Sequence, residues 1–254
     1  MSLLLTVLLL ATQDHKPEFE VSGAVKYKSF LTRDQRATIL NDYRDYNDYA
    51  LMELGVDLNF QIPLPFELET LTVRAHPYFW IAQENNLCHI GLETEIEYPI
   101  FDSLDFGYRH YSWHNADDDS PDNRGRTQDS FYLLWNFADW RFGEDGPLLS
   151  FFLRPQVYAY NTDPMAIQDF YTSNDPGARY ELRAGARLDC QKFHAEVWPY
   201  ARADSDFDVW VGGVAGQVSY DLFKNVSLFA DINEIFGQGI RLDIIAIGMA
   251  IRFN

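Results

Sequence analysis

The chain has 254 residues, of which 16% are aromatic, and its formal net charge is −18. So acidic a protein is a poor partner for nucleic acid, whose phosphates require a basic surface, but its surface can gather divalent cations. The longest apolar stretch, residues 3–11, is too short to cross a bilayer as a helix, which argues against a helical membrane protein.

The apolar stretch near the N-terminus is followed by a polar segment, Thr12-Gln13-Asp14. This order is typical of a secretion signal, although no Lys or Arg precedes the apolar residues. We therefore predict a signal peptide over residues 1–13; the alternative is a frayed apolar N-terminus.

Period-two alternation dominates the rest of the chain, and residues 50–62 show it most clearly. Every even position there is apolar, whereas the odd positions include Glu53, Asp57 and Gln61. A β-strand turns successive side chains to opposite faces, so one face of this segment is apolar and the other polar. About twelve such segments follow one another, and they start near Phe19, Ala50, Thr70, Leu87, Leu104, Asp129, Leu148, Arg179, Phe193, Val209, Asn225 and Asp243.

Short turns alternate with a second set of connections between these segments. This second set contains the longest loops, all of them polar: residues 31–48, 113–127 and 161–178. This alternation, with an even number of strands, is typical of outer-membrane barrels, and closure leaves no unpaired strand edge in lipid. We therefore predict an all-β fold, a transmembrane antiparallel β-barrel of about 12 strands. It forms a single domain over residues 18–254, in an outer membrane of the Gram-negative type. A soluble sandwich is the alternative, but its core is too small for this many apolar rows.

Acidic side chains alternate along the segment that starts near Leu87. Glu93, Glu95 and Glu97 share the polar face, next to Arg74 and Arg109 on the neighbouring segments. Paired catalytic acids are one interpretation. We favour a structural ladder of charges inside the barrel, because opposite charges on neighbouring strands compensate one another when buried.

A His and a Ser lie on the apolar face of the segment that starts at Leu104. Phe106 and Tyr108 belong to the outward row, so His110 and Ser112 continue it. On the next segment the outward row is residues 131, 133, 135 and 137, and Asp129 has their parity. We expect all three polar residues to face outward at the rim of the barrel.

A Ser, a His and an Asp can together form a catalytic triad, in which the His and the Asp activate the serine hydroxyl. Alternate residues of a strand have Cα atoms about 6–7 Å apart, so the side chains of His110 and Ser112 can approach each other. His110 would act as general base, Ser112 as nucleophile, and Asp129 would orient the imidazole. The plain alternative is that these are ordinary polar residues at a barrel rim.

The stretch "GYRHYSWHNADDD…RTQDSFYLLW" resembles the outer-membrane phospholipase A family, whose motif reads approximately H-x-S-N-G-R…R-S-W-N-R-x-Y. His110 and Ser112 correspond to its His and Ser, and Arg126, Asp129 and Tyr132 to its second half. The resemblance implies a twelve-stranded lipid esterase that uses calcium and dimerises.

The chain departs from the family pattern at two places. Asp129 replaces the usual Asn, and residues 113–115, Trp-His-Asn, replace a segment with a Gly whose amide helps to hold the oxyanion. His114 is either a bystander or a substitute oxyanion donor. The acidic loop suggests calcium ligands, because carboxylates suit this hard cation; the candidates are Asp117, Asp118, Asp119 and Asp122, and a solvated acidic loop is the alternative.

The sequence therefore predicts a calcium-assisted phospholipase A-like serine esterase with membrane phospholipids as partners and substrates, no nucleic-acid partner, and a possible homodimer. A non-catalytic pore or structural barrel is a second hypothesis. A lipid A deacylase is a third, because such enzymes use a similar outward His and Ser.

Overall fold

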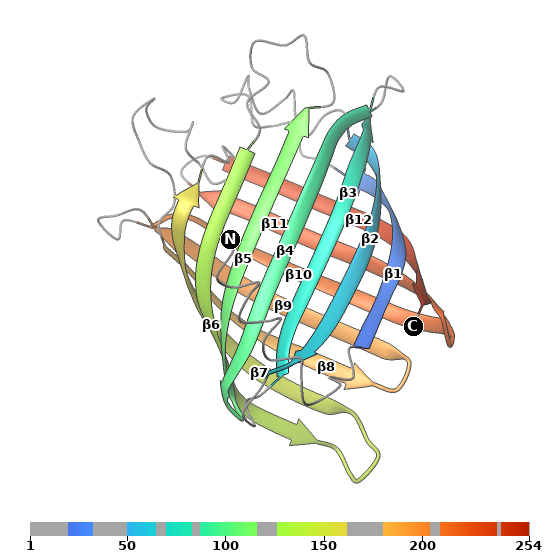
Figure 1. Ribbon diagram of the computed structural model, residues 1–254, viewed down its shortest axis with the longest axis vertical. Coiled ribbons are helices and arrows are strands. Elements are labelled where there is room, and N and C mark those ends of the chain that lie inside the picture. The colour runs from blue at the N-terminus through green and yellow to red at the C-terminus, as the bar shows by residue number, and fades with distance from the viewer. Residues whose placement is uncertain are drawn as a thin grey trace.

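The computed structural model describes eight stretches of the chain, residues 20–32, 50–64, 70–82, 87–115, 126–161, 180–203, 209–237 and 240–253. Within them, twelve antiparallel strands close into a barrel in which β1 pairs with β12 (Figure 1). The strands are β1 (Glu20–Thr32), β2 (Ala50–Pro63), β3 (Thr70–Ala82), β4 (Leu87–Phe101), β5 (Leu104–Asn115), β6 (Arg126–Arg141), β7 (Leu148–Asn161), β8 (Tyr180–Cys190), β9 (Phe193–Ala203), β10 (Val209–Phe223), β11 (Val226–Gly237) and β12 (Ile240–Phe253). No helix that could cross a membrane occurs in these stretches.

The predicted all-β barrel is confirmed, and most strands begin within one residue of the predicted positions. Two strands begin three residues earlier than predicted, β6 at Arg126 and β12 at Ile240. Arg126 still pairs with Trp113 of β5, and Ile240 with Gly237 of β11. The prediction followed apolar alternation, but backbone pairing continues into the polar rim where that alternation ends.

The two faces of each strand differ sharply in exposure, as β6 shows. Its outward residues Phe131, Leu133 and Trp135 are 42%, 39% and 48% exposed, whereas the alternating Ser130 and Tyr132 are buried. A closed barrel with an apolar exterior satisfies every backbone hydrogen bond without presenting an edge to lipid. This architecture identifies an outer-membrane protein whose strands cross the bilayer.

The ends of the barrel differ in their connections. At one end, turns of two residues join β4 to β5, β8 to β9 and β10 to β11. At the other end, residues 116–125 separate β5 from β6 and residues 162–179 separate β7 from β8; both segments lie outside the described residues. In outer-membrane barrels the short turns face the periplasm, so the loop end is the outer one.

The interior contains ion pairs between neighbouring strands. Arg74 of β3 and Arg154 of β7 both donate to Glu95 at 3.0 Å, and Arg109 of β5 pairs with Glu93. The predicted ladder of charges is therefore confirmed, and it reaches further round the barrel than expected because β7 contributes Arg154.

A second interior cluster is centred on Glu181 of β8, whose side chain is fully buried. Glu181 pairs with Arg183 and, at 2.5 Å, with Arg202 of β9, and it accepts a 2.8 Å hydrogen bond from the Tyr158 hydroxyl. Two cations and a hydroxyl compensate this buried carboxylate, as a charge removed from water requires. The interior of the barrel is thus polar where its exterior is apolar.

Candidate active site

The predicted site lies where β5 and β6 run side by side near the outer end of the barrel. His110 and Asp129 are direct partners across the two strands, and Ser112 is paired with Leu92 on β4 and Thr127 on β6. Directly opposed residues share a face of the sheet. Leu92 is an exposed, outward residue, so Ser112 and its neighbour His110 are on the lipid-facing side, as the alternation predicted.

His110 and Asp129 form a close contact. The distance from His110 Nδ1 to Asp129 Oδ1 is 2.8 Å, and both side chains are about three-quarters buried, with exposures of 28% and 26%. A neutral imidazole can make this bond only by donating from Nδ1, which leaves Nε2 free to accept a proton. The contact therefore gives His110 the tautomer that a general base requires.

Ser112 is buried, with 9% of its surface exposed, and it lies two residues from His110 on the same face of β5. Within the described part of the chain, its hydroxyl makes no hydrogen bond to His110. His110 therefore contacts Asp129 but, among the described residues, not the Ser112 hydroxyl. Catalytic hydrogen bonds are often long without substrate and tighten when it binds, so the missing bond between Ser112 and His110 is compatible with a serine nucleophile.

Tyr108 is a third partner of this cluster, and the sequence did not predict it. It was assigned to the apolar outward row, but its hydroxyl donates a 2.6 Å hydrogen bond to Asp129 Oδ1, the same oxygen that contacts His110. Tyr108 is half-buried, and a tyrosine hydroxyl removed from water usually finds a partner. Alternation in the sequence places Tyr108, His110 and Asp129 on one face, but it does not set the register that brings Tyr108 to Asp129.

These two donors explain how a carboxylate is tolerated at position 129. A carboxylate near hydrocarbon is costly to desolvate unless it is hydrogen-bonded. Asp129 has Tyr108 and His110 as partners on one oxygen, and the Phe131 ring packs against the Tyr108 ring at a centroid distance of 5.4 Å. The aromatic contact holds Tyr108 beside the carboxylate.

Behind the site, the inward residue Tyr132 links β6 to β4 and β7. Tyr132 lies opposite Gly107 of β5 and donates to Glu97 at 2.9 Å. The Arg154 guanidinium stacks over the Tyr132 ring at 3.6 Å. A Cβ at position 107 would collide with this ring, so glycine makes room for it. Tyr132 thus supports the strands and does not face the lipid.

Residues 113–115, which stand where the phospholipase A pattern has the Gly that helps to hold the oxyanion, follow Ser112 along β5. Trp113 is paired with Gly91 on one side and Arg126 on the other, so the backbone there is regular strand. The side chains of residues 113–115, His114 among them, lie outside the described part of the structure.

The predicted calcium ligands Asp117, Asp118, Asp119 and Asp122 also lie outside the described residues. Among the residues that are described, no group of three or more His, Cys, Asp or Glu side chains could hold a metal ion. Residues 1–13, the predicted signal peptide, are outside them as well.

No protein-family model matches the chain. No curated protein matches it in sequence either. Among solved structures, it is similar to outer membrane phospholipase A from Escherichia coli, with 15% identity and a TM-score of 0.48 over 96% of each chain. It is also similar to the KdgM porin, with 9% identity and a TM-score of 0.48 over 92% of this chain and 99% of that one. LpxR from Salmonella typhimurium has 9% identity and a TM-score of 0.47 over 91% and 99%. Identities this low leave the activity to be argued from the chain's own residues.

Proposed function

We propose that this barrel is a lipid esterase that hydrolyses acyl esters of membrane phospholipids. The observation that carries the proposal is the 2.8 Å contact between His110 Nδ1 and Asp129 Oδ1 on the lipid-facing exterior, on the same strand face as Ser112. A hydrolytic site directed toward lipid, near the outer end of the strands, meets the ester groups of the outer leaflet and not a soluble substrate. Both the position and the residue types support this substrate class.

The reaction would proceed through an acyl-enzyme. Ser112 Oγ attacks the ester carbonyl while His110 Nε2 takes the hydroxyl proton, and Asp129 stabilises the imidazolium that forms. The tetrahedral intermediate breaks its bond to the alcohol oxygen, which leaves as the lysolipid after His110 returns the proton. Water, deprotonated by His110, then attacks the acyl carbonyl and releases the fatty acid, and the proton passes back to Ser112.

Tyr108 would act in this scheme as a positioning residue. Its hydrogen bond to Asp129 Oδ1 keeps that oxygen directed at His110 and prevents the carboxylate from rotating toward water at the rim. It touches neither the nucleophile nor the ester, so its effect reaches the reaction only through Asp129.

We further propose that calcium assists the reaction, held by Asp117, Asp118, Asp119 and Asp122. Carboxylate oxygens are the ligands this cation prefers. When bound near Ser112, calcium would supply positive charge to the developing oxyanion. Because these residues lie outside the described part of the structure, the steps above use only the side chains of β5 and β6.

The test is fatty-acid release from phospholipid in mixed micelles by the purified, refolded barrel. We expect release by the wild type in the presence of calcium, and its loss in Ser112→Ala. The matched control is Ser103→Ala, in the exposed turn between β4 and β5 at the opposite end of the barrel, and it should keep full activity. Release that persists in Ser112→Ala would refute the assignment.

One observation favours a second candidate, a non-catalytic pore or structural barrel: the described residues form no hydrogen bond between Ser112 and His110. This candidate predicts ion conductance in planar bilayers and no phospholipid hydrolysis. A lipid A deacylase would use the same three residues, so lipid A should be offered to the same preparation in parallel. Release of fatty acid from lipid A alone would move the assignment to that substrate.

A further inference from the structure

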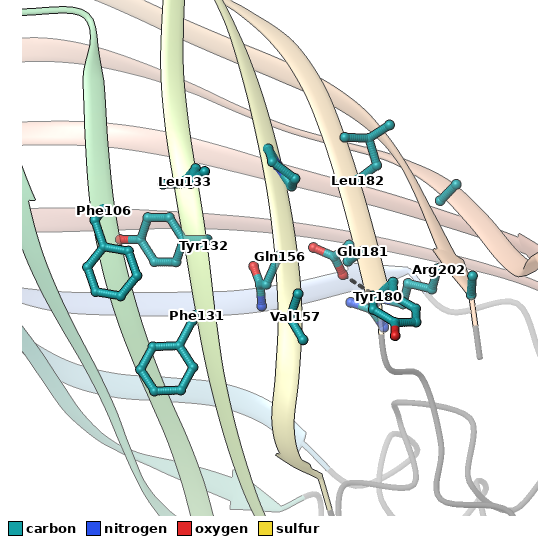
Figure 2. Close-up of a pocket in the computed structure, with 13 residues that line it drawn as sticks. Phe106, Phe131, Tyr132, Leu133, Gln156, Val157, Tyr180, Glu181, Leu182 and Arg202 are labelled. Atoms are coloured by element: carbon teal, nitrogen blue, oxygen red, sulfur yellow. Dashed lines mark hydrogen bonds and ion pairs between the residues drawn. The ribbon is translucent and has the colours of Figure 1, made fainter. Parts of the chain in front are cut away.

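A hollow lies on the exterior of the barrel beside the candidate site, over strands β5 to β9. Its volume is about 620 Å³. Figure 2 shows Phe106 and Phe131 at one end and Tyr180 and Leu182 at the other. The volume is in the range of about 300–1,000 Å³ that is usual for small-molecule sites.

Strand register explains why the exterior is hollow there. Val157 of β7 is paired with Phe131 on one side and with Tyr180 on the other, and Tyr180 is paired with Ala203. In the adjoining row, Leu182 of β8 is paired with Ala201 of β9. Large side chains on β5, β6 and β8 therefore face two alanines on β9, and the short side chains leave a depression between them.

The hollow is continuous with the candidate site. Phe131, which lines it, is two residues from Asp129 on β6, and its ring contacts Tyr108, whose hydroxyl is bonded to Asp129. Every outward side chain around the hollow is apolar or aromatic; these residues are Phe106, Phe131, Leu133, Pro155, Val157, Tyr180, Leu182, Ala201 and Ala203.

We propose that this hollow binds the acyl chain of the ester that Ser112 attacks, an inference that rests on the proposed function. Its walls face the hydrocarbon of the bilayer, so a lipid chain is the occupant available to it. Transfer of a chain from bilayer to hollow gains no hydrophobic energy, because both are apolar, and only shape and van der Waals contact distinguish them. The hollow therefore acts by orienting the chain.

The test compares long and short acyl esters in one variant and its control. Ala201→Phe places a large side chain in the hollow on a lipid-facing surface that tolerates apolar groups. We expect hydrolysis of a dipalmitoyl phospholipid to fall by about tenfold or more, as misplaced substrates commonly do, while hydrolysis of a dihexanoyl phospholipid is unchanged. The control is Ala186→Phe, which fills a separate exterior hollow of about 370 Å³ lined by Leu188 and Val197; it should leave both rates unchanged.

The outcomes separate the two proposals. If the wild type shows no Ser112-dependent release from either ester, the proposed function fails, and the acyl site with it. If release is Ser112-dependent but Ala201→Phe leaves both rates unchanged or lowers both alike, only the acyl site is overturned. Sedimentation in detergent measures the oligomeric state of the wild type and of Ala201→Phe. If the substitution shifts a dimer toward monomer, a second copy of the chain occupies the hollow, and the acyl site is overturned.

Discussion

Tyr108→Phe is the substitution that tests most closely how the candidate site is held together. It removes one hydroxyl, the donor of the 2.6 Å bond to Asp129 Oδ1, and leaves the ring in contact with Phe131. A hydrogen bond to a charged group contributes about 1.5–3 kcal/mol. If the whole contribution is felt in the transition state, kcat falls by about 10- to 150-fold. Because the hydroxyl does not touch substrate, KM should not change.

The same substitution in an Asp129→Asn background separates positioning from packing. The asparagine oxygen still accepts the bond but carries no charge, and a neutral hydrogen bond contributes only about 0.5–1.5 kcal/mol. Tyr108→Phe should then lower kcat by about 2- to 12-fold. A smaller effect in this background is the signature of a bond to the charged carboxylate.

Fatty-acid release over a range of phospholipid concentrations gives kcat and KM for the wild type, for Tyr108→Phe, for Asp129→Asn and for the double variant. Tyr220→Phe is the control, since Tyr220 is an exposed outward tyrosine of β10, and its kinetics should equal those of the wild type. A positioning role for Tyr108 is refuted if Tyr108→Phe leaves kcat unaltered, if it raises KM alone, or if its effect is equally large with Asn at position 129.

Three further predictions concern the scaffold and the metal. Gly107→Ala should lower the free energy of unfolding by about 1–3 kcal/mol, because a Cβ there collides with the Tyr132 ring; urea titration in detergent measures this, and an unchanged midpoint would contradict it. Arg154→Ala should lower the free energy of unfolding by about 3 kcal/mol. This is the low end for breaking a buried ion pair, because Glu95 still pairs with Arg74. The same urea titration measures the change, Lys192→Ala in an exposed turn is the control, and an equal midpoint for the two variants would contradict the prediction. Chelation by EDTA should abolish hydrolysis, and calcium but not magnesium should restore it; activity that survives EDTA would remove calcium from the proposal.

Much of the fold could be predicted because a membrane imposes a simple rule on every strand. One face must be apolar, so period-two alternation marked the strands and their lipid-facing sides. The rule ends where the hydrocarbon ends, and for that reason the starts of β6 and β12 were placed three residues late. Arg154 was missing from the predicted ladder for a different cause: it joins β7 to Glu95 of β4 across the interior, and alternation along one strand carries no information on contacts across the barrel.

In the candidate site, too, some features could be predicted from the sequence and others could not. The outward direction of His110 and Ser112 follows from parity within one strand, and sequence was sufficient for it. The bond from Tyr108 to Asp129 and the hollow over β5–β9 depend on the register between strands, which the order of residues does not determine.

The proposed esterase is tested most directly by whether His110 makes Ser112 a nucleophile. A long-chain alkyl sulfonyl fluoride, incubated with the barrel in detergent and followed by peptide mass spectrometry, should add a single sulfonyl group at Ser112. The adduct should be absent in His110→Asn, and Ser103 should stay unmodified in both proteins. Absence of the adduct from the wild type, or equal labelling of Ser112 in His110→Asn, would contradict the proposed mechanism.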